Sequence, residues 1–444
     1  MTVSRTICLG FMTVILIGTL LLMLPISTID GQWNDLIVAL FTSTSAVCVT
    51  GHIVVNTPDH FSFWGQLFIL GLIQIGGLGY MTATTFLLIL LGRRFGLRDR
   101  VAIQQSLDRN ELQGVSGMVR SIIALTLIFE ITGILLLLVA FLPDRSPGEA
   151  LWSAIFHSVS AWNNAGFSVF SDNMVSYQSS WLVNLVVPGL VIFGGIGYEV
   201  ILEIYLLLRD RLQRKAGRLV VSLGFKVAIT TTAILLVMGT IAIFFAEKSN
   251  DDIFSTLPLK TQWLAAWFQS AATRTAGFNS IDVGGMSTTS LFIMIALMFI
   301  GGSPGGTAGG IKTTTLRVMT SCTKAILQGK EEVLLYERQL PISVILKAVG
   351  VVVGSVFTVI VMTALITFFD PEVDFIRVLF EVVSAFATVG LSTGITAGLS
   401  TASKLVLIAT MYIGRVGVLL LMGSILGDPV PSSIRYPEEN LLVG

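Results

Sequence analysis

The sequence contains few charged residues and few side chains that bind metals. Only 12% of its 444 residues are Asp, Glu, Lys or Arg, whereas soluble domains contain about 25%. Three cysteines and three histidines show no clustered ligand spacing, which argues against a disulfide framework and a zinc site. The formal net charge is zero, so nothing indicates a nucleic-acid partner.

Apolar residues are abundant instead. They make up 53% of the chain, and the mean hydropathy is +0.84. This composition predicts a membrane protein that crosses the bilayer several times. The uncharged run 6–24 is longer than the apolar core of a signal peptide and lacks a small-residue cleavage pattern, so we interpret it as a first spanning helix.

The apolar segments are arranged as four pairs. About 20 apolar residues cross a bilayer, and the candidate spans are 6–24, 64–92, 117–141, 181–208, 219–245, 287–322, 342–369 and 404–427. Each pair encloses a semi-apolar segment of about a dozen residues, which is too short to span and fits a re-entrant pore helix. We therefore expect an all-α membrane protein with eight transmembrane helices, in four helix–pore-helix–helix repeats around a pseudo-fourfold ion pore. The repeats are predicted at 1–92, 93–208, 209–328 and 329–444.

A short motif recurs between the members of each pair. Its four copies are SAVCVTGHIV (45–54), SAWNNAGFSV (160–169), AATRTAGFNS (271–280) and SAFATVGLST (384–393). Their glycines, Gly51, Gly166, Gly277 and Gly390, are 115, 111 and 113 residues apart. A small residue precedes each glycine by six positions and an aromatic residue precedes it by ten. The regular spacing indicates an internal repeat.

Four such loops at mid-membrane have a specific chemical use. Non-helical backbone at that depth is tolerated only where protein buries it or a water-filled cavity receives it. A half-helix that turns back at a glycine presents carbonyl oxygens, which replace the hydration shell of a monovalent cation. Ordinary packing glycines are the alternative, but four in register favour a ring of carbonyls. The predicted potassium-binding residues are Val49, Thr50, Gly51, Asn164, Ala165, Gly166, Thr275, Ala276, Gly277, Thr388, Val389 and Gly390.

Charge placement predicts the orientation. The segments 93–120, 209–226 and 312–347 each contain six Lys or Arg residues, whereas the opposite connections are mostly acidic. By the positive-inside rule, both termini face the cytoplasm and the pore mouth faces outward. The longest hydrophilic connection is under 40 residues, so we expect any regulatory domain to belong to another chain.

A second glycine motif lies in the second helix of each pair. It reads IGGLGY (75–80), FGGIGY (193–198), IGGSPGG (300–306) and IGRVGV (413–418). In the first two copies we expect close helix packing inside continuous helices. The third copy extends to 312 with six glycines and a proline, which predicts a break in the helix. The fourth carries Arg415 deep in an apolar helix, where its guanidinium needs acceptors such as the carbonyls of an unwound loop.

Together, these loops and repeats resemble the Trk/Ktr/HKT family of potassium transporters over essentially the whole chain. The short termini are most similar to those of the membrane subunits of bacterial Ktr systems. Glycine in all four loops implies potassium selectivity in that family. The resemblance also implies that the third loop is an intramembrane gate held by an arginine of the last helix. The corresponding residues are Gly301, Gly302, Gly305, Gly306, Gly309, Gly310, Lys312 and Arg415.

Further expectations follow from the resemblance. We expect two copies of the chain to form a homodimer in the lipid of the plasma or inner membrane. This dimer is expected to lie above a cytoplasmic ring of RCK-type (KtrA-like) nucleotide-binding subunits. Transport of potassium with a dependence on sodium is implied, with no organic cofactor in this chain. Anchoring of the loop by Arg415 without gating stays open as an alternative.

Other charged residues and other functions complete the expectations. We expect Arg274 to form a structural salt bridge with a pore-helix carboxylate such as Glu381, and His52 to be a packed ring. A secondary transporter of a small organic solute is the alternative function, although such carriers usually have two inverted halves. An enzyme is not expected, because no nucleophile–base pair, metal cluster or phosphate loop is evident.

Overall fold

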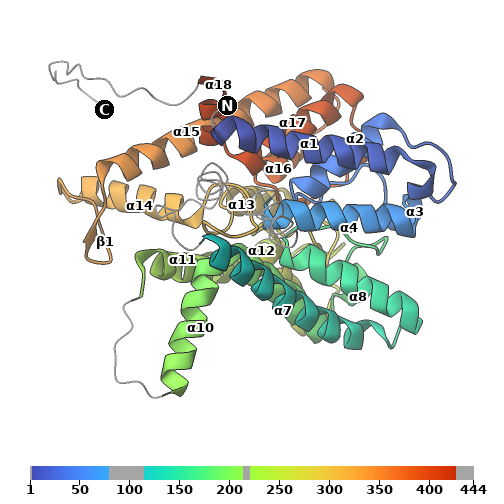
Figure 1. Cartoon of the computed structure of the whole chain (residues 1–444), viewed down its shortest axis with the longest axis horizontal. Coiled ribbons are helices and arrows are strands. Elements are labelled where there is room, and N and C mark those ends of the chain that lie inside the picture. Colours follow the sequence, from blue (N-terminus) through green and yellow to red (C-terminus); the bar gives the residue numbers. More distant parts are fainter. Residues whose placement is uncertain (1–2, 80–114, 214–220, 427–444) are drawn as a thin grey trace.

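The computed structural model describes residues 3–79, 115–213 and 221–426, and its regular structure is almost entirely helical (Figure 1). The helices up to residue 212 are α1 (Val3–Met23), α2 (Leu36–Val47), α3 (Thr57–His60), α4 (Phe63–Leu78), α7 (Val115–Phe141), α8 (Pro147–Trp162), α9 (Trp181–Ile196) and α10 (Tyr198–Leu212). Those from residue 223 are α11 (Leu223–Glu247), α12 (Leu259–Ala272), α13 (Thr288–Met298), α14 (Thr313–Leu327), α15 (Ile342–Phe369), α16 (Phe375–Phe386), α17 (Thr401–Val416) and α18 (Val418–Leu426).

Short 3-10 turns and one hairpin supplement the helices. The turns are Pro25–Ser27, Val175–Tyr177 and Thr396–Gly398. Strands β1 (Leu334–Leu335) and β2 (Arg338–Gln339) pair antiparallel, with Leu334 opposite Gln339. This hairpin joins α14 to α15.

Several helices are long and apolar enough to cross a membrane. Within the described residues these are Ser4–Met23, Val119–Phe141, Leu223–Glu247 and Ile342–Phe369, and two bent pairs, α9 with α10 and α17 with α18, raise the number to six. The chain is therefore a helical membrane protein, as predicted.

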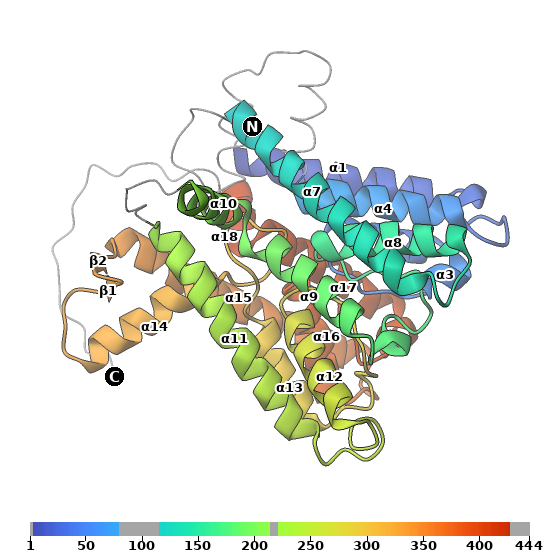
Figure 2. The same ribbon diagram turned by 90° about the horizontal axis from the view of Figure 1, so that it is seen from below.

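The expected half-helices are present. Helices α2, α8, α12 and α16 have 12, 16, 14 and 12 residues. At 1.5 Å per residue they are about 18–24 Å long, which is shorter than a hydrocarbon core of about 30 Å. Their C-terminal halves are buried, and each is followed by one of the four glycine motifs. Figure 2 shows α12 beside α11, which also packs against α13.

Serine caps fix where the second helices begin. The hydroxyl oxygens of Ser62, Ser180, Ser287 and Ser400 accept hydrogen bonds from backbone N–H groups in the first turns of α4, α9, α13 and α17. A capping serine satisfies a donor that the helix itself leaves free. The same cap in all four repeats places their second helices in equivalent positions.

Two predicted spans are wrong as continuous helices. The span 181–208 breaks at Gly197 with a bend of 103°, and 404–427 breaks at Gly417 with a bend of 93°. Both glycines have a positive φ, 96° and 89°, which glycine adopts without the steric cost that a Cβ brings. Helix α4 likewise ends before Gly79 (φ 76°), and the rest of the predicted span 64–92 lies outside the described residues. The glycine motifs therefore mark helix ends and not helix interiors.

The break predicted in the third repeat is present. Helix α13 ends at Met298 and α14 begins at Thr313. The two ends of the intervening loop are joined by a parallel bridge between Ile300 and Ile311. The segment 299–312 is therefore an irregular loop inside the helical bundle.

Candidate functional site

The four glycine motifs adopt the same backbone conformation. Each motif, numbered loop 1 to loop 4 in chain order, contributes three consecutive potassium-binding residues to the prediction. The third of the three is glycine with a positive φ. The first is not glycine, yet its φ is also positive. The glycine φ values are 92°, 69°, 72° and 86° for Gly51, Gly166, Gly277 and Gly390. The first residues are Val49, Asn164, Thr275 and Thr388, with φ from 52° to 65°. Side-chain-bearing residues seldom adopt this region, so the surrounding structure must hold the loops in it.

The four loops close into a ring. A methyl group added to any of the four glycines would lie less than 3.0 Å from the carbonyl oxygen of the central residue in another loop. The pairs are Gly51 with Ala165, Gly166 with Ala276, Gly277 with Val389, and Gly390 with Thr50. Loop 1 thus contacts loop 2, loop 2 contacts loop 3, loop 3 contacts loop 4, and loop 4 returns to loop 1. All twelve predicted residues come together in this ring.

The ends of the short helices support the loops. The backbone N–H groups of Thr50, Ala165 and Val389 donate to the carbonyls of Ser45, Ser160 and Ser384 at 2.7–2.8 Å. In loops 2 and 4 the serine hydroxyl also donates to the residue after the glycine, Ser160 to Phe167 at 2.8 Å and Ser384 to Leu391 at 2.6 Å. These bonds explain the serine six positions before the glycine in the second and fourth copies. In the third copy that position is Ala271, which has no hydroxyl.

The second glycine motif packs against the short helices. A methyl group at Gly76, Gly194 or Gly414 would lie under 3.0 Å from the last carbonyls of α2, α8 and α16 respectively. The close packing predicted for the first two copies is therefore present, and it extends to the fourth. In the third copy Gly301 lies against Gly309 of its own loop.

Loop 301–312 lies directly against the ring. A methyl group at Gly309 would meet the side chain of Thr388, and the Thr307 hydroxyl donates to Asn164 Oδ1 at 2.8 Å. The N–H groups of Ser303 and Thr307 donate to the carbonyls of Gly195 and Gly194 at 2.9 and 3.1 Å. The loop is thus tied to the second repeat as well as to its own.

Arg415 bridges the loop to the first repeat. Its guanidinium donates to the carbonyl of Thr307 at 2.5 Å and to the carbonyl of Gly76 at the end of α4. The expectation that the unwound loop supplies its acceptors is met at Thr307, whereas the second acceptor, Gly76, lies in the last turn of α4. Lys312 donates within the loop, from Nζ to the Ala308 carbonyl at 2.6 Å.

The salt bridge predicted between Arg274 and Glu381 is absent from the described contacts. Arg274 donates instead to the carbonyls of Ile300 and Gly301, where α13 has just unwound. Glu381 is fully buried and accepts hydrogen bonds from Ser392, Thr393 and Thr396, the loop that follows Gly390. The free carbonyls of the broken helix are thus the partners that the arginine finds.

Two polar contacts join neighbouring repeats near the ring. His52 is buried with its Nδ1 3.2 Å from Glu381 Oε2, so loop 1 contacts α16. Asn163 Nδ2, at the C-terminal end of α8, donates to Gln74 Oε1 on α4 at 2.8 Å, and within its own repeat it also donates to the buried Glu130 on α7 at 3.2 Å. The interpretation of His52 as a packed ring is consistent with this burial.

A cavity of about 880 Å³ lies beside loop 301–312. Its wall includes Gly77, Gly194, Thr307 and Arg415, so the helix ends of three repeats and the loop itself border it. It offers backbone carbonyls and a guanidinium, with no group of three His, Cys, Asp or Glu side chains among the described residues that could hold a metal ion. The arrangement is a chamber next to a carbonyl ring.

One repeated contact escaped the sequence analysis. Gly18, Gly133 and Gly239 lie in the first helices of their repeats. A methyl group at any of them would lie under 3.0 Å from the hydroxyl of a serine in the short helix of the same repeat. That hydroxyl donates a hydrogen bond to the carbonyl of the residue three positions before the glycine. The serines are Ser43, Ser158 and Ser270. A glycine in the first helix paired with a serine in the short helix, in three of the four repeats, was the available signal.

Comparisons with known proteins agree over the full length. The model of a family described as TrkH, cation transport protein, matches residues 5–425. The chain is 38% identical to Ktr system potassium uptake protein B of Bacillus subtilis, covering 100% of this chain and 97% of that protein. It is 35% identical to the potassium/sodium uptake protein NtpJ of Enterococcus hirae, covering 99% and 97%.

A solved structure has the same fold. The potassium transporter TrkH from Vibrio parahaemolyticus matches with a TM-score of 0.70, covering 95% of this chain and 85% of that one, at 19% identity. At this identity the likeness supports the fold alone. The resemblance predicted from the four loops is confirmed by the family match and by the full-length relatives.

Proposed function

The chain belongs to the TrkH family of cation transport proteins, and from this premise we propose that it is the potassium-translocating transmembrane subunit of a Ktr-type uptake system. The observation that carries the proposal is the closed ring of four glycine loops. Each glycine lies against the central carbonyl of the next loop, which supports our assignment of the backbone oxygens of the twelve predicted residues to one ring around the pore axis. Such oxygens replace the water around a potassium ion.

The proposed architecture is eight transmembrane segments in four repeats with the predicted boundaries. Four long helices, the two bent pairs, and the α4 and α13 segments supply the eight. The short helices point their C-terminal ends, with their partial negative charge, at the ring. Large exposed apolar side chains on α7 and α15, such as Ile128, Leu135 and Phe357, face lipid. Both termini face the cytoplasm, as the basic connections predict.

Loop 301–312 is the proposed gate. It lies between the ring, through Thr388 and Asn164, and the 880 Å³ cavity, and Arg415 holds it to the first repeat. An arginine that donates to two carbonyls on different elements forms a latch whose release frees the loop. Gly301, Gly302, Gly305, Gly306, Gly309, Gly310 and Lys312 are its remaining proposed residues.

The remaining proposals concern ions and partners. We assign potassium as the transported ion and propose a dependence on sodium, since one full-length relative is named a potassium/sodium uptake protein. Two copies of the chain associate above a cytoplasmic ring of nucleotide-binding subunits, because the chain aligns throughout with a protein named as part of a Ktr system.

The test is potassium uptake in cells that lack their own uptake systems, with sodium varied. Gly51→Ser places a side chain at φ 92° against the Ala165 carbonyl, so we expect the preference for potassium over sodium to fall by about tenfold, a difference of about 1.4 kcal/mol. The same change at Gly71 on α4, where nothing lies within 4 Å, is the matched control and should keep the preference for potassium.

Unchanged selectivity after substitution of all four loop glycines, one at a time, overturns the ring assignment. Uptake of an organic solute in place of potassium would favour the alternative carrier.

A further inference from the structure

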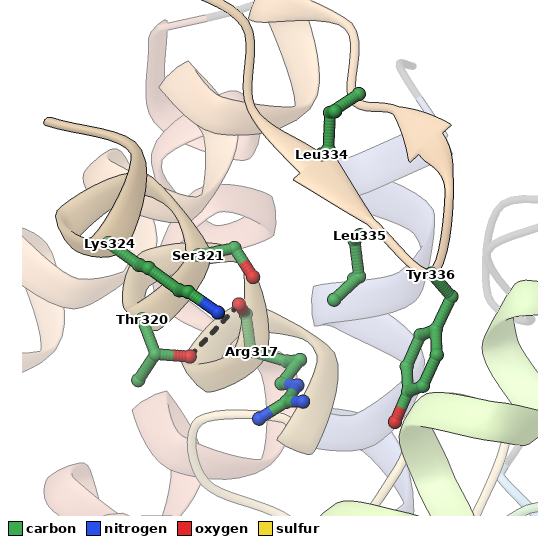
Figure 3. A pocket seen from close by; sticks show the side chains of 7 residues that line it. All are labelled: Arg317, Thr320, Ser321, Lys324, Leu334, Leu335 and Tyr336. Carbon is green, nitrogen blue, oxygen red and sulfur yellow. Dashed lines mark hydrogen bonds between the residues drawn. The ribbon is translucent and has the colours of Figure 1, made fainter. Parts of the chain in front are cut away.

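A second, smaller cavity lies away from the glycine loops. Its volume is about 280 Å³, and it is enclosed between α14 and the β-hairpin (Figure 3). Arg317, Thr320, Ser321 and Lys324 line it from α14, and residues 334–336 line it from the hairpin. None of these residues belongs to the proposed ring or gate.

The α14 residues form one polar face. Positions 317, 320, 321 and 324 follow the i, i+3, i+4, i+7 pattern, which places them on the same side of a helix. Two cations therefore flank two hydroxyls, and Figure 3 shows Lys324 extending across this face above Thr320. The hydroxyl of Thr320 donates to the Arg317 carbonyl at 3.1 Å. The face presents donors suited to an anion.

A third cation lies on the neighbouring helix. The Lys226 amine is 5.8 Å from the centre of the Tyr336 ring, and the Arg317 guanidinium carbon is 5.8 Å from the same ring. Within the described part of the chain, no carboxylate forms an ion pair with Arg317, Lys324 or Lys226. Arg317 Nε is moreover buried without a hydrogen-bond acceptor. The cluster therefore has unneutralised charge and an unsatisfied donor.

The wall opposite α14 is held in place. The hydroxyl groups of Tyr336 and Thr230 on α11 are 2.7 Å apart and hydrogen-bonded. Tyr336 and Glu337 form the hairpin turn with positive φ values of 49° and 62°, as the tight turns of two-residue hairpins require. The cavity is thus bounded by a helix, a hairpin and an anchoring contact to a third element.

Its depth follows from the helices around it. Lys226 lies in the first turn of α11 and the hairpin ends three residues before α15, and both helices are long enough to span the bilayer. Ile326, Leu327 and Ile342 beside it are 75–82% exposed. Exposed apolar side chains next to cations at the start of spanning helices indicate the headgroup level of the membrane.

We propose that this cavity binds a phosphate group, and its depth points to the phosphodiester of an anionic membrane lipid. Arg317 binds two phosphate oxygens through its planar fork, while Lys324, Lys226 and the hydroxyls of Thr320 and Ser321 contact the others. The lipid tails extend along Ile326, Leu327 and Ile342. The site joins α14, which follows loop 301–312, to the hairpin that leads into α15.

The experiment measures lipid binding to the purified full chain, and its readout does not depend on ion transport. Phosphatidylglycerol, phosphatidylcholine and inorganic phosphate are added separately to delipidated protein, and bound ligand is counted by native mass spectrometry. We expect phosphatidylglycerol to bind more tightly than phosphatidylcholine. The double variant Arg317→Gln/Lys324→Gln should weaken its binding by about thirtyfold, which corresponds to two cations near an anionic surface.

Controls separate the site from general charge. Lys330→Gln/Arg338→Gln removes two exposed cations that do not line the cavity and should leave binding unchanged. The single variant Lys324→Gln, at an exposed position, keeps the test valid if the double variant does not fold. Binding of inorganic phosphate with the same sensitivity to Arg317 and Lys324 identifies the ligand as a soluble phosphate and overturns the lipid assignment. Equal binding to parent and both cavity variants overturns the site.

Discussion

At the scale of single residues, glycine was predictable and its neighbours were not. Gly51, Gly166, Gly277 and Gly390 stand out because only glycine suits a tight turn at membrane depth. The positive φ of Val49 and Thr388 has no such signature, because β-branched residues disfavour it. The contacts with adjacent loops impose that conformation, and these contacts exist only in the assembled ring.

The same limit explains the wrong partner for Arg274. Its position beside the third glycine loop suggested a pore-helix carboxylate as its partner, but the acceptors are the carbonyls of Ile300 and Gly301. Those oxygens are free only because α13 ends at Met298. A side-chain partner is visible in a sequence, whereas a backbone partner becomes visible only once the local helix break is known.

The serine hydroxyls that hold the loops yield a prediction at this scale. Ser160→Ala removes the hydrogen bond to Phe167 in loop 2, so we expect a loss of about 1 kcal/mol of stability and a lower potassium-to-sodium preference. Ser158→Ala, two residues away, removes an equally buried bond to the Glu130 carbonyl and should cost similar stability without changing selectivity. Thermal unfolding and competitive uptake measure the two effects. Equal selectivity changes in both variants would show that general destabilisation, and not the loop contact, is responsible.

At the scale of elements, the lengths of the semi-apolar segments predicted the half-helices. Two helix breaks were not predicted, because they lie within continuous apolar segments. The segment 181–208 is apolar enough to read as one helix, and a single glycine costs a helix only about 1 kcal/mol. The break is set by tertiary contact, because a methyl group at Gly197 would meet the Pro304 carbonyl of loop 301–312. Helix propensity does not determine whether this segment forms one helix or two, whereas its packing against loop 301–312 does.

The latch predicts the behaviour of loop 301–312. Deleting part of 305–310, or substituting Arg415→Ala or Arg415→Lys, removes or weakens contacts to Thr307 and Gly76. We expect the ion flux to rise with little change in selectivity, since the ring is untouched; lysine lacks the planar fork that reaches two carbonyls. Flux through folded, membrane-inserted variants is the measurement. Arg338→Lys on the β-hairpin, at an exposed position, is the control. Flux at or below the parent level in every loop and Arg415 variant would instead favour a purely structural anchor.

At the scale of the whole molecule, the number of repeats was readable but their arrangement was not. Spacing of 115, 111 and 113 residues between glycines gives four units, yet it does not say which loops are neighbours. The contacts place them around the ring in chain order. The predicted basic connections fall partly outside the described residues, at 93–114 and 214–220.

Helix α10 predicts where a soluble partner binds. Helix α10 bends away from α9 by 103° and carries Arg209 and Arg211. Both arginines belong to the basic segment 209–226, which the positive-inside rule predicts to face the cytoplasm. We expect the full chain to co-elute with a nucleotide-binding protein, and uptake to respond to ATP or NADH. Arg209→Gln/Arg211→Gln should weaken co-elution, most clearly at low ionic strength, because exposed charges are screened by salt. Lys248→Gln/Lys260→Gln, at the opposite connection between α11 and α12, should leave it unchanged. If the chain elutes alone and neither nucleotide changes uptake, the proposed partner surface is wrong. The proposed carbonyl ring is tested separately, by the selectivity of its glycine variants.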